Sequence, residues 1–278
     1  MLESAALVPG AHAVGPLAVL SALILSAAST RIWSRNVGET SCGWRTDYSP
    51  DGRAFGIWGL LYLGTVATAL LQLSSLVFVV DWWANFYFAL TWVFCAAWVP
   101  LFDAESPGFL VLAATQIALA AASATSGAWL ADAWRDRETR VTAVALSWPL
   151  SLLAGWLLTA TSIGVGIAAK ANAHDAQKAC ILVPPQERDE TERSYRQRRR
   201  VLYREAYARA PAVESPVPIV LSAALAGLAV LIGDPLLPLP LVWAIVNLKA
   251  FPAVSYVLSI VLCGCGVAGA LVRSCVRF

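Results

Sequence analysis

Long stretches without a charged residue alternate with short polar segments along most of the chain. Asp, Glu, Lys and Arg are absent from 4–30, 54–80, 82–102, 106–131, 141–169, 215–233, 235–248 and 250–272. Most of these runs reach the ~20 residues that an α-helix needs to cross ~30 Å of hydrocarbon. A series of such runs is rare in water-soluble proteins, so the pattern predicts a single bundle of seven or eight membrane segments.

Proline and charged residues mark the ends of the predicted helices. We expect helices near 13–29, 54–80, 83–102, 107–131, 140–168, 216–233, 239–249 and 253–273. The seventh is short and follows Pro235, Pro238 and Pro240. Because proline interrupts helices, both a full span and a partial or re-entrant segment are open for it.

The composition agrees with this pattern. Apolar residues make up 58% of the 278 positions and charged residues only 14%, whereas an average soluble domain is about 25% charged. The net charge of +2 gives no indication of nucleic-acid binding. The predicted fold is therefore all-α, a polytopic membrane helix bundle.

One long hydrophilic insert, residues 171–215, interrupts the apolar runs. Its centre, 186–210, is predicted to be a basic helix after a Pro-Pro pair. We expect its basic and aromatic side chains to contact a partner or anionic lipid headgroups. These candidate contact residues are Arg196, Arg198, Arg199, Arg200 and Tyr203.

The distribution of positive charge predicts an orientation. With eight crossings, 15 of the 20 Lys and Arg residues lie on the side of the insert. The other side has Arg135, Arg137, Arg140, Arg273 and Arg277. The positive-inside rule then places the insert on the cytoplasmic, matrix or stromal face.

Residues that could carry catalysis or hold a metal are scarce. The chain has two histidines, and its six cysteines show no CxxC pairing, so neither a zinc nor a haem-iron site is predicted. No acid–base pair can be placed at membrane depth, and the ionisable groups that coupled transporters need there are missing as well. We therefore predict a protein that is not an enzyme.

Tryptophan is the positive signal, with 12 residues in the chain. Trp92 and Trp156 fall near helix middles, where an interfacial aromatic belt does not apply and an indole N–H needs a partner. Trp58 and Tyr62 are four residues apart, on one face of the second helix. Two interpretations are equally open: a cleft for a flat apolar ligand, or plain aromatic packing between helices.

Four stretches carry a family resemblance when they are taken in order. They are Ser49-Pro-Asp-Gly-Arg-Ala-Phe-Gly-Ile-Trp-Gly-Leu-Leu-Tyr62, Ala97-Trp98-Val-Pro100-Leu-Phe102, the stripe of Pro149, Trp156 and Ala160, and Leu241-Val-Trp243-Ala244. They resemble the tryptophan-rich sensory protein family, also called the TspO/MBR or peripheral benzodiazepine receptor family. Phe55 fits the longer members, which add helices after a five-helix core.

The resemblance implies a five-helix membrane core in 1–170, the insert in 171–215 and additional membrane helices in 216–278. It implies binding of porphyrins, sterols or related planar hydrophobes, in an outer mitochondrial or a bacterial membrane. Phe55, Trp58, Tyr62, Trp92, Trp98 and Trp156 are the candidate ligand-binding residues. The chain departs from the family at Cys95 and Gly164, where the family often has Asn.

Two functions follow from these observations. The first is a non-enzymatic membrane protein whose aromatic cleft binds a porphyrin- or chlorophyll-type tetrapyrrole, a sterol or a lipid. The second is a structural accessory subunit of a large respiratory or photosynthetic membrane complex, suggested by the lost amides and the gained insert. The expected partners are membrane lipids, other membrane subunits or a second copy of the chain, in a mitochondrial, plastid or bacterial membrane.

Overall fold

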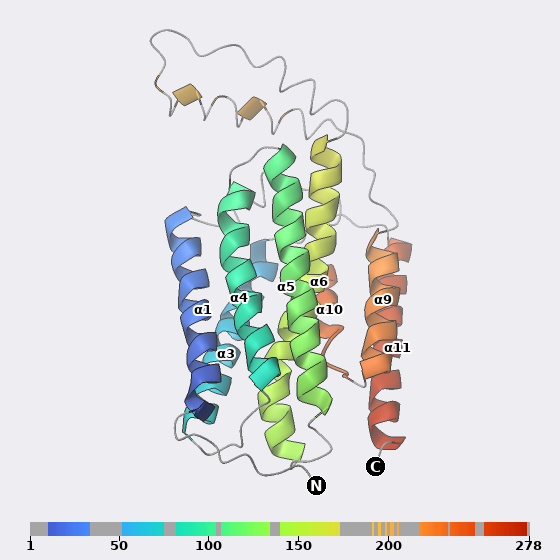
Figure 1. Ribbon diagram of the computed structural model, residues 1–278. Helices are drawn as coiled ribbons and strands as arrows, with labels where there is room; N and C mark the ends of the chain where they lie inside the picture. Colours follow the sequence, from blue (N-terminus) through green and yellow to red (C-terminus); the bar gives the residue numbers. More distant parts are fainter. Residues whose placement is uncertain are drawn as a thin grey trace.

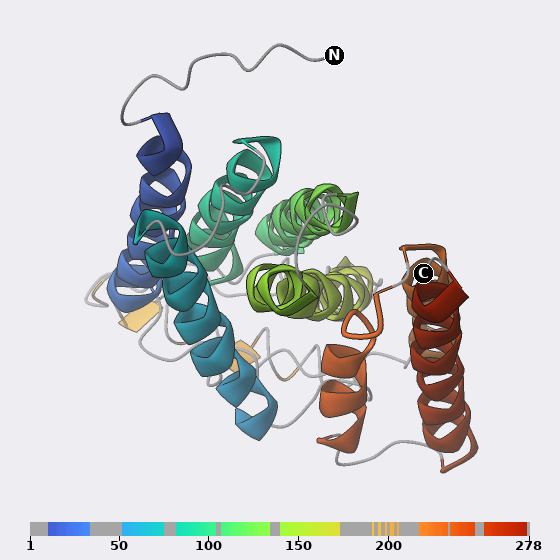
Figure 2. The ribbon, with the colours of Figure 1, turned by 90° about the horizontal axis from the view of Figure 1, so that it is seen from below.

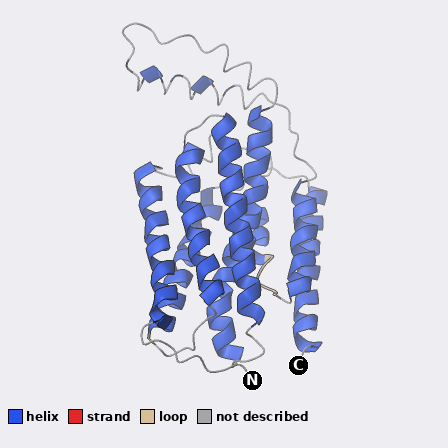
Figure 3. Ribbon diagram, viewed as in Figure 1, coloured by secondary structure: helices blue, strands red, loops and turns tan. Residues whose placement is uncertain are grey.

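The computed structural model describes the protein as a bundle of long helices (Figures 1 and 3). The described residues are 11–33, 52–74, 82–103, 107–133, 140–172, 217–232, 234–247 and 253–276, with single positions between 191 and 205. Among them there is no strand. The predicted all-α membrane bundle is therefore confirmed.

Among the described residues, five helices are long and apolar enough to cross a membrane. They form an up-and-down core in which successive helices run in opposite directions (Figure 1). They are α1 (Ala11–Trp33), α3 (Ile57–Leu73), α4 (Trp82–Asp103), α5 (Pro107–Ala133) and α6 (Arg140–Asn172). In the described part of the chain after Asn172, three further helices are defined from end to end: α9 (Val217–Ile232), α10 (Leu239–Val246) and α11 (Ala253–Val276). The protein is an integral membrane protein.

The core helices enclose an apolar interior. The main contacts join α1 to α4, α4 to α5 and α5 to α6, and α3 packs on both α1 and α6 (Figure 2). The largest side chains at the centre, Trp92 and Trp156, are 0% and 2% exposed. Several hydroxyl groups of the bundle bond to their own helix, as Thr65 Oγ1 does to the Leu61 carbonyl oxygen at 2.8 Å, whereas Ser29 Oγ of α1 donates to the Ala96 carbonyl oxygen of α4 at 2.7 Å.

The second helix differs at both ends from its uncharged run. It begins as a 3-10 turn, η1 (Gly52–Gly56), and it ends at Leu73 although the run continues to Val80. Ser74 closes the last turn, because its hydroxyl donates to the Leu71 carbonyl oxygen at 2.8 Å. The end of the helix at Leu73 could not be predicted from hydrophobicity alone, because the residues that follow are also uncharged.

Helices α9 and α11 form a pair beside the core and run in the same direction (Figures 1 and 2). A Cβ added at Gly266 would lie 2.6 Å from Ala226 Cα, and one at Gly269 would lie 2.6 Å from Val230 Cγ2. Contacts that advance together along both helices require a parallel arrangement. The chain between them must therefore return to the side on which α9 begins.

Helix α10 belongs to this return segment. It has eight residues, which gives a length of about 12 Å at ~1.5 Å per residue. Asp234 Oδ1 accepts the Leu236 N–H at 2.9 Å and fixes the turn around Pro235, before Pro238 and Pro240. Helix α10 packs on α6 and α11, with Leu241, Ala244 and Ile245 buried.

Candidate functional site: an aromatic cleft in the helical core

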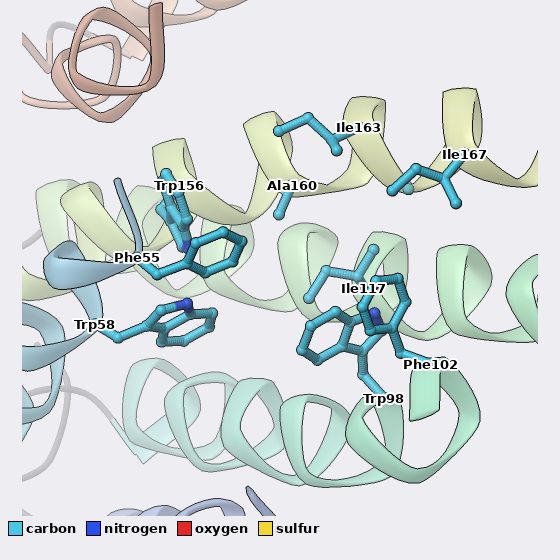
Figure 4. Close-up of a pocket in the computed structure, with 10 residues that line it drawn as sticks. Phe55, Trp58, Trp98, Phe102, Ile117, Trp156, Ala160, Ile163 and Ile167 are labelled. Atoms are coloured by element: carbon cyan, nitrogen blue, oxygen red, sulfur yellow. The ribbon is translucent and has the colours of Figure 1, made fainter. Parts of the chain in front are cut away.

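A small cleft lies among η1, α3, α4, α5 and α6 (Figure 4). Its walls are aromatic and aliphatic, and its free volume is about 50 Å³. The lining residues are Phe55, Trp58, Trp98, Phe102, Ile117, Trp156, Ala160, Ile163, Gly164 and Ile167. The cleft is thus built almost wholly from apolar side chains.

One end of the cleft is formed where η1 meets α6. The Phe55 and Trp156 rings meet edge to face, with centroids 6.1 Å apart and planes at 84°. Trp58 approaches the same indole at 6.3 Å and 87°. Edge-to-face pairs at these distances are favourable beyond the area they bury. The 3-10 turn places Phe55 against α6, one turn before Trp58.

The other end is formed by the last turn of α4. Trp98 and Phe102 are four residues apart and stack at 5.0 Å with an interplanar angle of 21°. Figure 4 shows this pair facing Trp58 and Phe55 across the space, with Ile117 of α5 beside it. Two aromatic walls therefore face each other along the cleft.

Tyr62 and Trp92 lie behind Trp58 and do not line the cleft. Trp58 contacts both rings, at 6.1 Å and 6.2 Å. The Tyr62 hydroxyl is directed to Ser26 and Thr30 of α1. Together with Phe55, Trp58 and Trp156 they form one connected cluster of aromatic rings.

The polar groups of the site are indole N–H donors. Trp92 Nε1 and Trp156 Nε1 are buried and have no hydrogen-bond partner among the described residues. None of the ten lining side chains offers an oxygen or nitrogen acceptor. An unpaired buried donor costs ~1–3 kcal/mol. An acceptor carried by a ligand would remove that cost at Trp156.

The structure brings the six predicted aromatic residues together. Phe55, Trp58, Trp98 and Trp156 line the cleft, and Tyr62 and Trp92 support it. The sequence interpretation missed Phe102, Ile117, Ile163 and Ile167 as lining residues. The i, i+4 spacing of Trp98 and Phe102 could have indicated Phe102. Ile117 stands in a run of small residues that gives no comparable signal.

Of the five predicted contact residues of the insert, the structure describes only Arg198. Arg198 lies with its guanidinium carbon 5.7 Å from the centroid of the Tyr195 ring. Arg196, Arg199, Arg200 and Tyr203 lie outside the described residues.

Comparison with known proteins identifies the family to which the chain belongs. A family described as TSPO-like protein matches residues 13–179, which is more than half of the chain. The chain belongs to the TSPO-like family. No curated protein and no solved structure matches it.

The cleft lies within the part of the chain that matches the TSPO-like family, and the two positions at which the resemblance noted above implies Asn are Cys95 and Gly164 in this chain. Cys95 is 2% exposed and packs inside the core, and Gly164 lines the cleft. Neither residue offers an amide donor to a ligand. The described residues contain no group of three or more metal-ligating side chains, and the TSPO-like family is generally non-enzymatic.

Proposed function

We propose that this TSPO-like protein is a non-enzymatic membrane receptor whose aromatic cleft binds a planar apolar ligand, with a tetrapyrrole as the first candidate. The observation that carries the proposal is the Trp156 N–H, a buried donor without an acceptor at the wall of an apolar cleft. A flat ring system with acceptor groups at its edge would complement both features. Sterols and lipids share only part of this chemistry, because most of their surface is not a flat π system.

The aromatic walls support a flat ligand. Phe55, Trp58 and Trp98 present ring faces and edges to the same space (Figure 4). Stacking on such rings favours a conjugated macrocycle over a flexible chain. The free volume of about 50 Å³ is below the ~150 Å³ of a cavity that holds benzene, so the rings must move apart when a macrocycle enters.

The test is a titration of the protein in lipid nanodiscs with protoporphyrin IX, followed by porphyrin absorbance. Saturable binding with a stoichiometry of one is expected for the wild type. Trp156→Phe keeps an aromatic ring but removes the donor, and should weaken binding about three- to tenfold. Trp129→Phe changes an indole that is 63% exposed and serves as the matched control.

Cholesterol in the same nanodiscs, as competitor, separates the tetrapyrrole from the sterol. Displacement of porphyrin by equimolar cholesterol would favour a sterol ligand. Absence of saturable porphyrin binding, or equal binding by wild type and Trp156→Phe, would contradict the tetrapyrrole proposal.

An accessory-subunit role is the second candidate. The small cleft volume and the absence of amides at Cys95 and Gly164 favour it, because they fit a core that is packed for stability. The test is purification from native membranes in a mild detergent. Co-purification of other membrane subunits at fixed stoichiometry is expected, and a homodimer free of other chains would rule the role out.

We also propose that the insert faces the cytoplasm, matrix or stroma of a bacterial or organellar membrane and contacts anionic headgroups or a partner through Arg196, Arg198, Arg199, Arg200 and Tyr203. The parallel α9 and α11 support the eight-crossing count behind this orientation. Protease protection in sealed vesicles tests it: cleavage within 171–215 should require access to the positive-inside face.

A further inference from the structure

The return segment between α9 and α11 touches the aromatic cleft from behind. This segment, residues 234–247, includes α10 and lies beyond the residues 13–179 that match the family. It contacts both η1 and α6, the two elements that form one end of the cleft. The contacts fall at two backbone positions.

The first contact is a hydrogen bond across 189 positions of the sequence. Trp243 Nε1 donates to the Ala54 carbonyl oxygen at 2.9 Å. The Trp243 ring is 44% exposed, whereas Ala54 is 0% exposed. The bond therefore reaches from the surface of α10 to a buried peptide group, and the next residue along the chain is Phe55.

The second contact is a close approach of two backbones. Gly155 of α6 receives the Leu237 carbonyl oxygen, and a Cβ at Gly155 would collide with that oxygen. The same Cβ would lie 3.1 Å from Pro240 Cδ. Leu237 is 0% exposed, so the contact between Leu237 and Gly155 is fully buried. The next residue along α6 is Trp156.

The two contacted residues directly precede the two rings that meet at 6.1 Å in the cleft wall. We propose that the return segment is a positioning element, in which Trp243 and Leu237 set the spacing of Phe55 and Trp156 and thereby the affinity of the cleft. This inference rests on the proposed ligand-binding function. It assigns a role in the site to a part of the chain that contributes no lining side chain.

The experiment uses the full chain in nanodiscs, labelled with 5-fluorotryptophan. The ¹⁹F resonance of Trp156 is assigned by its loss in Trp156→Phe. Trp243→Phe removes the hydrogen bond but keeps a ring, and Gly155→Ala places a methyl group where the Leu237 carbonyl lies. The matched controls are Trp129→Phe, at an exposed indole, and Gly227→Ala, where an added Cβ meets nothing within 4 Å.

Both variants should shift the Trp156 resonance, and both controls should leave it in place. Protoporphyrin IX should bind about three- to tenfold more weakly to each variant. This is the change in Kd that corresponds to the net free energy of about one hydrogen bond. Circular dichroism should show unchanged helix content. A Trp156 resonance identical to that of the wild type in both variants would overturn the inference.

The two proposals fail in different ways. If the wild type binds porphyrin and both variants bind it equally well, the positioning role is wrong and the binding function stands. If the wild type does not bind porphyrin, the tetrapyrrole function is wrong, and the fluorine shift alone decides whether the return segment positions Trp156.

Discussion

Tyr62 of α3 and Trp92 of α4 stack behind the cleft, with ring centroids 5.0 Å apart and planes at 24°. Trp92 is 0% exposed, and Trp58 rests on both rings. This stack joins the cleft wall to the rest of the core. Its first role is therefore structural, since neither ring lines the cleft.

Replacing Trp92 should cost more stability than any exposed tryptophan. Trp92→Ala removes a fully buried indole and leaves a cavity next to Tyr62, with an expected loss of ~3–5 kcal/mol. Trp129→Ala, at an exposed position, should change the free energy of unfolding by less than ~0.5 kcal/mol. Denaturant titration in detergent, followed by circular dichroism, measures both. Equal losses in the two variants would show that the stack does not hold the core.

The fold could be predicted from the sequence because lipid imposes a simple rule. Charges cannot remain in hydrocarbon, so the uncharged runs marked the core helices. Trp58, Trp98 and Trp156 gathered as expected because their positions lie on inward faces of three helices. Two features could not be predicted: the end of α3 at Leu73 and the close contact of Leu237 with Gly155. The first depends on local backbone hydrogen bonds and the second on a close approach of two backbones, and hydropathy encodes neither.

A pair of amides joins α3 and α4 inside the bundle. Asn85 Nδ2 donates to Gln72 Oε1 at 2.9 Å, and Gln72 Nε2 donates to Asn85 Oδ1 at 3.3 Å. Truncating either side chain removes the reciprocal hydrogen bonds that it makes with the other amide inside the bundle. Gln72→Ala and Asn85→Ala should each cost ~1–3 kcal/mol.

A double-mutant cycle isolates the interaction itself. The double variant should be less destabilised than the sum of the single variants, with a coupling energy of ~0.6–1.7 kcal/mol. Apparent unfolding free energies in detergent provide the four corners of the cycle. Strictly additive losses would mean that the reciprocal bonds contribute nothing.

Two glycines on α11 provide a matched pair for the contact with α9. Gly266→Ala puts a methyl group 2.6 Å from Ala226 Cα, so the helices must separate, at a cost of ~1–3 kcal/mol. Gly264→Ala meets nothing within 4 Å and should be neutral or slightly stabilising. Thermal unfolding of the two variants in the same detergent compares them. The contact inferred between α9 and α11 is wrong if both variants melt together.

Restoring an amide to the cleft should strengthen ligand binding. Gly164 lines the cleft, and a Cβ there meets Ala114 Cα at 3.6 Å, an ordinary contact, so a side chain can begin at this position. Gly164→Asn adds both a donor and an acceptor to a wall that now offers only indole donors. One new hydrogen bond should increase the affinity for protoporphyrin IX about three- to tenfold.

Gly164→Ala is the matched control for Gly164→Asn, because it fills the same space without a polar group. It should bind porphyrin no better than the wild type and should gain ~0.5–1 kcal/mol of helix stability. Gly59→Asn adds the same amide on α3, where a Cβ meets nothing within 4 Å, and should leave affinity unchanged. An affinity gain with Ala equal to that with Asn would assign the effect to helix rigidity, and an equal gain at Gly59 would assign it to an amide anywhere on the bundle. Only a gain confined to Gly164→Asn supports a ligand that lies against this wall of α6.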